Sequence, residues 1–161
     1  MAAEQGYDSA QLNLGIIYAH QRKPRFKEAV RLYKLAARQG NRNASFNLGM
    51  YYDEGRGVRR DSREAFRWYL AAARLGDVDA QNWIGHSYHE GQGVRRNFAE
   101  SVRWYRKAAR ADHVHALYNL GLCYKRGDGV PTNRRLAIHY FKAAAAQGHE
   151  GAIHQVKTTP P

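Results

Sequence analysis

The chain has 161 residues, which is enough for one domain with a hydrophobic core or for one short repeat array. Hydrophobic residues make up 43% of it, which argues against disorder, and its apolar runs are too short to span a bilayer. A formal net charge of +12 predicts attraction to acidic partners, and a single cysteine, Cys123, excludes an internal disulfide.

A short pattern recurs four times along the chain. The segments are AQLNLGIIY from Ala10, ASFNLGMYY from Ala44, AQNWIGHSY from Ala80 and ALYNLGLCY from Ala116, so their starts lie 34, 36 and 36 residues apart. Within each segment Ala, Leu or Ile, and Tyr recur at i, i+4 and i+8, which is one face of an α-helix. A fixed period of this size indicates a stacked array of similar units, and we call the helix that carries this pattern helix A.

A second helix, helix B, follows in each unit. Glycine pairs in Gly-x-Gly-Val, beginning at Gly55, Gly91 and Gly127, end helix A because glycine readily takes the left-handed conformation. Asp61 and Asn97 are then N-caps of helix B, each with a glutamate three residues later that completes a capping box. Asn133 caps the fourth unit, where Leu136 replaces the glutamate. Helix B carries Ala-x-x-Trp-Tyr, or a variant of it, and its small residues permit close helix approach.

The two ends of the chain and its first loop depart from this pattern. The first loop, AHQRKPRFKE after Tyr18, has no glycine, so we expect another shape for it. Gly6 matches Gly40, which predicts that the chain begins inside an earlier helix B, and Ala152 matches Ala116, which predicts the start of a fifth helix A. The expected organisation is one array over residues 1–157, with an earlier tail at 2–9, repeats at 10–43, 44–79, 80–115 and 116–151, a fifth start at 152–157 and a flexible tail at 158–161.

The pattern Ala-x-x-x-Leu-Gly-x-x-Tyr, then Gly-x-Gly-Val, Ala-x-x-Trp-Tyr and Ala-Ala-x-x-Gly, resembles the Sel1-like repeat of the tetratricopeptide-type solenoids. The resemblance covers residues 2–157. It implies an all-α fold, a right-handed α-solenoid of antiparallel helix pairs with helix A lining the concave side. It also implies a role like that of the family's members, which act as adaptors in bacterial signalling, secretion and envelope functions and in eukaryotic protein quality control.

Helix A residues outside the packing pattern are candidates for a partner-binding groove. Several are apolar where the helix pair does not require it, and exposed apolar residues gathered on one concave surface indicate a partner site. We expect the groove to be lined by Leu12, Asn13, Ile16, Phe46, Asn47, Met50, Asn82, Trp83, His86, His89, Tyr118, Asn119 and Leu122.

Asparagines occupy one equivalent position of three repeats, at Asn13, Asn47 and Asn119, where the third repeat has Trp83. Such a ladder of amides is able to bind the main chain of an extended peptide. The alternative is that these amides bond across neighbouring helices, and the sequence leaves both readings open.

Histidines raise the question of a metal site. His86 and His89 are three residues apart on one helical face, and His113 and His115 begin the next helix A. Histidines on a polar groove are more often solvated than ligating, so we expect no metal and no cofactor. The segment HEGAIH from His149 spaces its histidines five apart rather than four, so they do not share a face as a metalloprotease motif requires.

Arginines also follow the period and predict a basic outer wall on helix B. Most such faces only keep a protein soluble, and docking to an acidic protein or membrane surface is the functional alternative. Aromatic residues are not interleaved among these arginines, so nucleic acid is not the expected partner. The wall consists of Arg31, Arg38, Arg67, Arg74, Arg103 and Arg110.

These features favour a non-enzymatic scaffold that binds an acidic partner protein or peptide, as a monomer or associated through the ends of the array. A dedicated inhibitor or immunity protein of a bacterial toxin is an alternative that the family resemblance implies. Lactam binding or hydrolysis, associated with a cysteine-rich branch, is disfavoured because the paired cysteines are missing. Met1 is followed by no secretory signal, so the compartment is open between cytoplasm and, for a fragment of an exported protein, periplasm.

Overall fold

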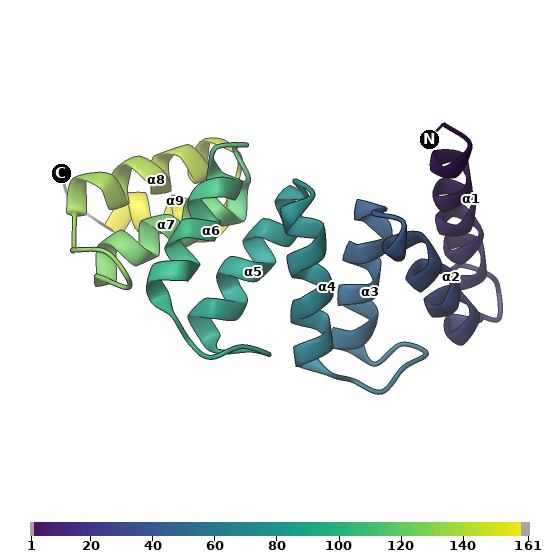
Figure 1. Cartoon of the computed structure of the whole chain (residues 1–161). Helices are drawn as coiled ribbons and strands as arrows, with labels where there is room; N and C mark the ends of the chain where they lie inside the picture. Colours follow the sequence, from purple (N-terminus) through teal and green to yellow (C-terminus); the bar gives the residue numbers. More distant parts are fainter. Residues whose placement is uncertain (1, 159–161) are drawn as a thin grey trace. The chain divides into compact units, whose positions relative to one another are not determined.

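The computed structural model describes residues 2–158, with side chains from residue 7 onward, and this part of the chain is all-helical (Figure 1). No strand occurs within it, so the predicted all-α repeat architecture is confirmed. The helices are α1 (Ala2–Ala19), α2 (Phe26–Arg38), α3 (Arg42–Glu54), α4 (Ser62–Arg74), α5 (Val78–Glu90), α6 (Phe98–Ala109), α7 (Val114–Arg126), α8 (Arg134–Ala146) and α9 (Glu150–Thr158).

The chain divides into two compact units. The first comprises residues 1–80 with 92–94, and the second comprises residues 81–91 with 95–161, so the division falls within α5. In the first unit α1 packs on α2, α2 on α3, and α3 on α4. In the second unit α6 packs on α7, α7 on α8, and α8 on α9. Each repeat is therefore a helix A and helix B pair, and within each unit consecutive repeats pack through helix B of one and helix A of the next.

Each helix A meets its helix B through a glycine and an aromatic ring. A Cβ placed on Gly49 would lie 2.5 Å from Cδ1 of Tyr69, and one on Gly85 would lie 2.5 Å from Cδ1 of Tyr105. Both distances are far below van der Waals contact, so only glycine lets the ring lie against the helix backbone. The same contact joins all four pairs, namely Gly15 with Tyr33, Gly49 with Tyr69, Gly85 with Tyr105, and Gly121 with Phe141.

The second glycine of each loop packs closely against the backbone of the preceding repeat. A Cβ on Gly57 would lie 2.5 Å from the carbonyl carbon of Phe26, the first residue of α2. Gly129 approaches the backbone of Phe98, the first residue of α6, in the same way. These glycines have positive φ angles, so both their conformation and the close approach require the missing side chain.

The first loop lacks glycine but closes with the same hydrogen bond as the others. The N–H of Arg25 donates to the carbonyl oxygen of Tyr18 at 2.8 Å, as the N–H of Asp61 donates to that of Tyr52 at 2.9 Å. Arg25 provides no side-chain cap for α2 and instead forms an ion pair with Glu28 at 3.0 Å.

The predicted caps of helix B are confirmed. Side-chain oxygens of Asp61, Asn97 and Asn133 accept hydrogen bonds from backbone N–H groups in the first turns of α4, α6 and α8. At the other end of helix B, Gly40, Gly76 and Gly148 have positive φ angles, and Asp112 takes the same conformation with a φ of 54°. Asp112 therefore fills the glycine position that the sequence pattern assigns to it.

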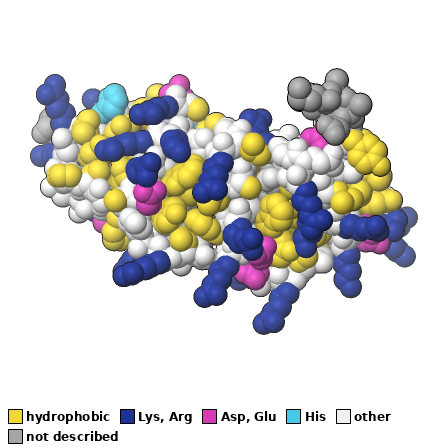
Figure 2. Space-filling model, viewed as in Figure 1, with side chains coloured by type: hydrophobic (Ala, Val, Ile, Leu, Met, Phe, Trp, Pro, Cys, Tyr) yellow, Lys and Arg dark blue, Asp and Glu magenta, His cyan; other side chains and the backbone are white. Residues whose placement is uncertain are grey.

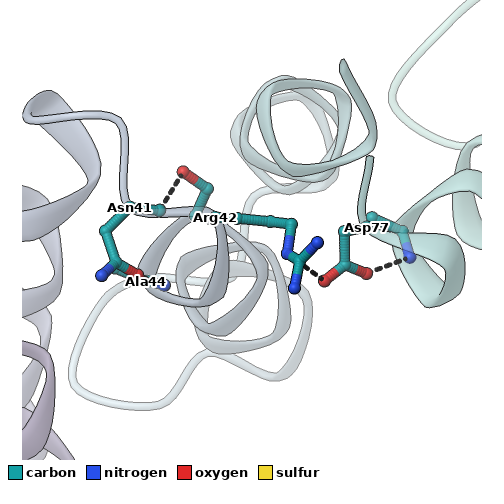
Figure 3. A network of polar contacts seen from close by, with 6 residues as sticks. Asn41, Arg42, Ala44 and Asp77 are labelled. Atoms are coloured by element: carbon teal, nitrogen blue, oxygen red, sulfur yellow. Dashed lines mark hydrogen bonds and ion pairs between the residues drawn. The ribbon is translucent and has the colours of Figure 1, made fainter. Parts of the chain in front are cut away.

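Helix A has its own caps, which also link consecutive repeats. The side chain of Asn41 accepts from the N–H of Ala44 at 2.9 Å and donates to Asp8 at 2.8 Å. Asp77 caps α5 by accepting from the N–H of Ala80 at 2.8 Å, and its other oxygen lies 3.8 Å from Arg42 (Figure 3). In both cases the cap of one helix A contacts a residue of the preceding helix A, Asp8 of α1 or Arg42 of α3.

The N-terminal helix differs from the prediction. The sequence predicts a separate helix end at Gly6, but α1 runs without a break from Ala2 to Ala19. One face of α1 is also exposed, because Leu14 and Ile17 have exposed fractions of 40% and 56%. Their counterparts Leu48 and Tyr51 are buried, with exposed fractions of 0% and 4%. In the later repeat these positions are covered by packing against the preceding helix B. Of the predicted tail at 158–161, residues 159–161 lie outside the described residues.

The glycine–aromatic contact predicts the sign of a substitution. In an unconstrained helix Gly→Ala stabilises by about 0.5–1 kcal/mol. At Gly121 we expect the opposite, a loss of about 1–3 kcal/mol, because the new methyl group would overlap the ring of Phe141. The free energy of unfolding in urea measures this loss. The double variant Gly121→Ala, Phe141→Leu should recover part of it. A Gly121→Ala variant more stable than wild type would show that the ring does not need the glycine.

Candidate functional site

In the first unit, some of the predicted groove residues are buried in the core and others lie at the surface. Leu12 is only 8% exposed and belongs to the hydrophobic core, so its assignment to the groove is wrong. Phe46 is half-buried, with its ring centroid 5.5 Å from that of Tyr69, and Met50 packs against the core. Ile16 is 38% exposed. Ile16 is therefore the one exposed residue among the apolar groove candidates of this unit.

Two asparagines of the predicted ladder already have partners inside the protein. The Asn119 amide nitrogen donates to the side-chain oxygen of Asn82 at 3.3 Å, which joins α7 to α5. The Asn47 amide hydrogen-bonds the hydroxyl of Tyr33, which joins α3 to α2. Asn13, on α1, is exposed. The amides of Asn47 and Asn119 therefore bond across neighbouring helices, which is one of the two alternatives left open by the sequence.

Four of the predicted residues of the second unit surround one small hollow of about 170 Å³. They come from the two helix A segments of this unit, α5 and α7, and α6 contributes one wall. The hollow is thus built mainly by side chains that differ from repeat to repeat. Its lining consists of His86, His89, Glu90, Tyr105, Asn119, Leu122, Cys123 and Arg126.

His89 is held between two carboxylates at the edge of this hollow. Its Nδ1 lies 2.7 Å from an oxygen of Glu90, and its Nε2 lies 3.3 Å from an oxygen of Asp128. Its ring also packs against Phe98, with centroids 5.0 Å apart. The hydrogen bond with His89 lowers the pKa of the exposed Glu90 carboxyl group. These contacts fix the His89 ring and occupy both carboxylates.

His86 is the opposite case, a buried nitrogen without a partner. Its Nδ1 is inaccessible to solvent and makes no hydrogen bond with any described residue. Its ring lies edge-on to Trp83, with centroids 5.9 Å apart. A buried unsatisfied polar group costs about 1–3 kcal/mol, and the described chain has two others, Nε1 of Trp68 and Oγ of Ser101.

Cys123 is not a nucleophile in this setting. Burial raises the pKa of its thiol to about 12, so the protonated form dominates near neutral pH. Its exposed fraction is 2%. Among the described residues, no three His, Cys, Asp or Glu side chains come close enough together to hold a metal ion.

The sequence analysis placed His113 at the start of a helix A but missed that His113 and His149 cap helices. The Nδ1 atoms of His113 and His149 accept hydrogen bonds at 3.2 Å from backbone N–H groups of α7 and α9. Their positions repeat those of the caps Asn41 and Asp77 at the array's period, and that spacing was the available signal. Tyr118, a predicted groove residue, stacks on the His149 ring with centroids 4.2 Å apart.

The predicted basic wall is exposed at all six arginines, and Figure 2 shows Lys and Arg side chains projecting from the visible face. Two of the six are locally compensated. Arg67 lies 2.6 Å from a carboxylate oxygen of Glu64, and Arg103 lies 2.8 Å from one of Glu100. These glutamates are the ones expected in the capping boxes. The wall is therefore a solvated face with internal ion pairs as well as a source of positive charge.

The repeat geometry agrees with a known family. The model of the Sel1 repeat matches residues 8–41, 42–77, 78–113 and 114–149. The chain belongs to the Sel1 repeat family. Each matched repeat spans one helix A and one helix B. The first match begins at residue 8, next to the first residue whose side chain is described. No curated protein sequence matches the chain.

Solved Sel1 repeat structures resemble this chain closely. A protective antigen of uropathogenic Escherichia coli strains with an SLR fold is 36% identical, with a TM-score of 0.90 over 96% of this chain and 34% of that one. A Sel1 repeat protein from Oxalobacter formigenes is 31% identical, with a TM-score of 0.88 over 94% of this chain and 63% of that one. The chain thus spans about a third and just under two thirds of these two proteins. Within residues 2–158, no helix has the length and apolar character needed to cross a membrane.

The histidine caps predict a stability that depends on pH. Burial, and then the nearby charge of His115, lower the pKa of His149, so the unfolded chain binds this proton more readily than the folded chain. The contribution of the cap is therefore complete well above pH 6.5 and is lost as the pH falls below that value. Hydrogen exchange of α9 amides between pH 7 and 5 should show the loss.

Asparagine accepts the same hydrogen bond without titrating. His149→Asn should therefore flatten the pH dependence of α9, whereas His154→Asn, at an exposed position of the same helix, should leave it unchanged. An equal effect of both substitutions would contradict the role of the cap.

Proposed function

We propose that this chain is a non-enzymatic protein-interaction module that binds a segment of a partner protein on the helix A side of its second unit. The observation that carries the proposal is the hollow lined by His86, His89, Asn119 and Leu122. The shared packing of the repeats does not fill this space. Membership of a repeat family that mediates protein interactions supports the same role.

The chemistry of the hollow supports binding rather than catalysis. Its thiol, Cys123, is buried and protonated, and His89 is fixed between two carboxylates. No described nucleophile in the lining stands beside a free base. The half-buried Leu122 offers apolar area, and Asn119 and Arg126 offer polar groups at its edge. A few polar groups around an apolar patch are typical of a protein-binding surface.

The net charge of +12 supports an acidic partner, because opposite charge accelerates association and disfavours basic competitors. The six exposed arginines of helix B contribute to this field without forming a shaped site. We therefore assign them a steering role and assign recognition to α5 and α7.

Capture of a partner from lysate of the host, followed by hydrogen exchange on the complex, tests the proposal. We expect new protection on α5 and α7. Leu122→Ala should weaken the captured complex by about tenfold, because truncating an apolar interface anchor costs more than 1 kcal/mol. The matched control is Leu136→Ala, since Leu136 is 36% exposed on α8, outside the hollow. Protection confined to helix B, or equal effects of the two substitutions, would contradict the proposal.

A further inference from the structure

We infer that α1 is a self-association surface, through which two copies of this chain pair with their α1 helices antiparallel. The surface is an apolar seam, the α1 seam, which consists of the exposed residues Tyr7, Ala10, Leu14 and Ile17. The inference is independent of the hollow, since the α1 seam belongs to the first unit and the hollow is lined by α5, α6 and α7. It is carried by the burial of the equivalent positions in later repeats, the spacing of the seam and the distribution of charge.

Three positions of the α1 seam belong to the core in every later repeat. Leu14 and Ile17 are 40% and 56% exposed, whereas their counterparts in α3, Leu48 and Tyr51, are buried. The ring of Tyr51 lies edge-on to that of Tyr33 on α2, with centroids 5.4 Å apart, so the preceding helix B covers it. The remaining counterparts of Ala10, Leu14 and Ile17 are also buried, namely Ala44, Ala80, Ile84, Ser87, Ala116, Leu120 and Cys123. Exposed apolar residues gathered on one face indicate an interaction site, and here the later repeats show that a helix fits it.

No helix B of the described chain folds back onto the α1 seam. In later repeats the chain turns between a helix B and the next helix A at glycines with positive φ angles, namely Gly40, Gly76 and Gly148. At the corresponding position, Gly6, α1 continues without a break. A helix that covers the α1 seam therefore comes from another molecule.

The spacing of the α1 seam fits a second α1 helix. Its residues follow one another at intervals of three, four and three, which is the a/d spacing of a two-helix coiled-coil contact. In an antiparallel pair centred on residue 12, Tyr7 of one copy faces Ile17 of the other, and Ala10 faces Leu14. Each layer then joins a larger side chain to a smaller one, as close packing requires. A parallel pair would set Ala10 against Ala10 and leave a gap.

Charge favours α1 as the place where two copies meet. Each copy carries a net charge of +12, so two copies repel each other, but none of the 26 Lys and Arg residues lies within residues 1–21. The charged residues of this stretch are Glu4 and Asp8. Arg22 and Lys23 follow the C-terminal end of α1 and are exposed. Antiparallel pairing directs them toward the acidic beginning of the other α1, whereas parallel pairing would direct them toward each other.

Sedimentation equilibrium of the whole chain tests the pairing. Because four side chains per copy form a small interface, we expect a dissociation constant of about 1–100 µM. The average mass should therefore rise with concentration from 18.4 kDa toward twice that value and then stay constant. Ile17→Glu should raise the dissociation constant at least about tenfold, because the pair would bury a carboxylate from each copy among apolar side chains.

The matched control is Leu75→Glu, which makes the same change of charge in the same unit. Leu75 is 47% exposed just after α4, so this substitution should change the dissociation constant less than about twofold. A mass that stays at 18.4 kDa up to about 1 mM, or equal effects of the two substitutions, would overturn the inference. Growth beyond twice the monomer mass would also overturn it, since it indicates a head-to-tail contact rather than a two-fold pair.

Cysteine substitutions test the direction of the two helices. The double variant Tyr7→Cys, Ile17→Cys should form disulfide-linked dimers on oxidation, because antiparallel pairing brings these two positions together. Ile17→Cys alone should stay unlinked, since the two copies of this position would lie about 15 Å apart along the helix axis. The native Cys123 is buried and does not interfere. Linked dimers of Ile17→Cys alone would indicate parallel helices and would overturn the inference.

Discussion

The structure depends on the contact between a glycine of helix A and an aromatic ring of helix B. At Gly49 and Gly85 a methyl group would lie 2.5 Å from a ring carbon, so the two backbones approach only because no side chain stands between them. Repetition of this contact sets the spacing within each pair, and the loop glycines, such as Gly57, set the approach of one pair to the next. A few positions per repeat therefore hold the helices together, and the neighbouring positions of helix A are free to vary.

The candidate site arises from that freedom. In the second unit the variable positions of α5 and α7 carry His86, His89, Asn119 and Leu122, and their side chains leave a small hollow instead of closing it. The polar groups of the hollow differ in whether they have hydrogen-bond partners. His89 is bonded on both ring nitrogens, whereas the buried Nδ1 of His86 has no acceptor within the described chain.

The repeat period of the sequence predicted the fold because the same type of residue fills the same structural role in successive repeats. Gly55 ends α3 in the left-handed conformation and Asp61 caps α4, as the pattern required. The site was predicted only in part. Leu12 entered the core because equivalent positions in other repeats differ in size, so the pattern did not reveal which way it faces. The bond between Asn119 and Asn82 depends on the geometry of two neighbouring helices, which one sequence does not specify.

The central claim is that His86 and Arg126, two of the residues that line the hollow, are not needed for cohesion. The most direct test is the free energy of unfolding, by urea, of the double variant His86→Ala, Arg126→Ala. The account predicts a stability within about 1 kcal/mol of wild type, because Arg126 is exposed and His86 buries an unsatisfied nitrogen. A loss of about 3 kcal/mol or more would show that these side chains hold the repeats together, and would contradict the account.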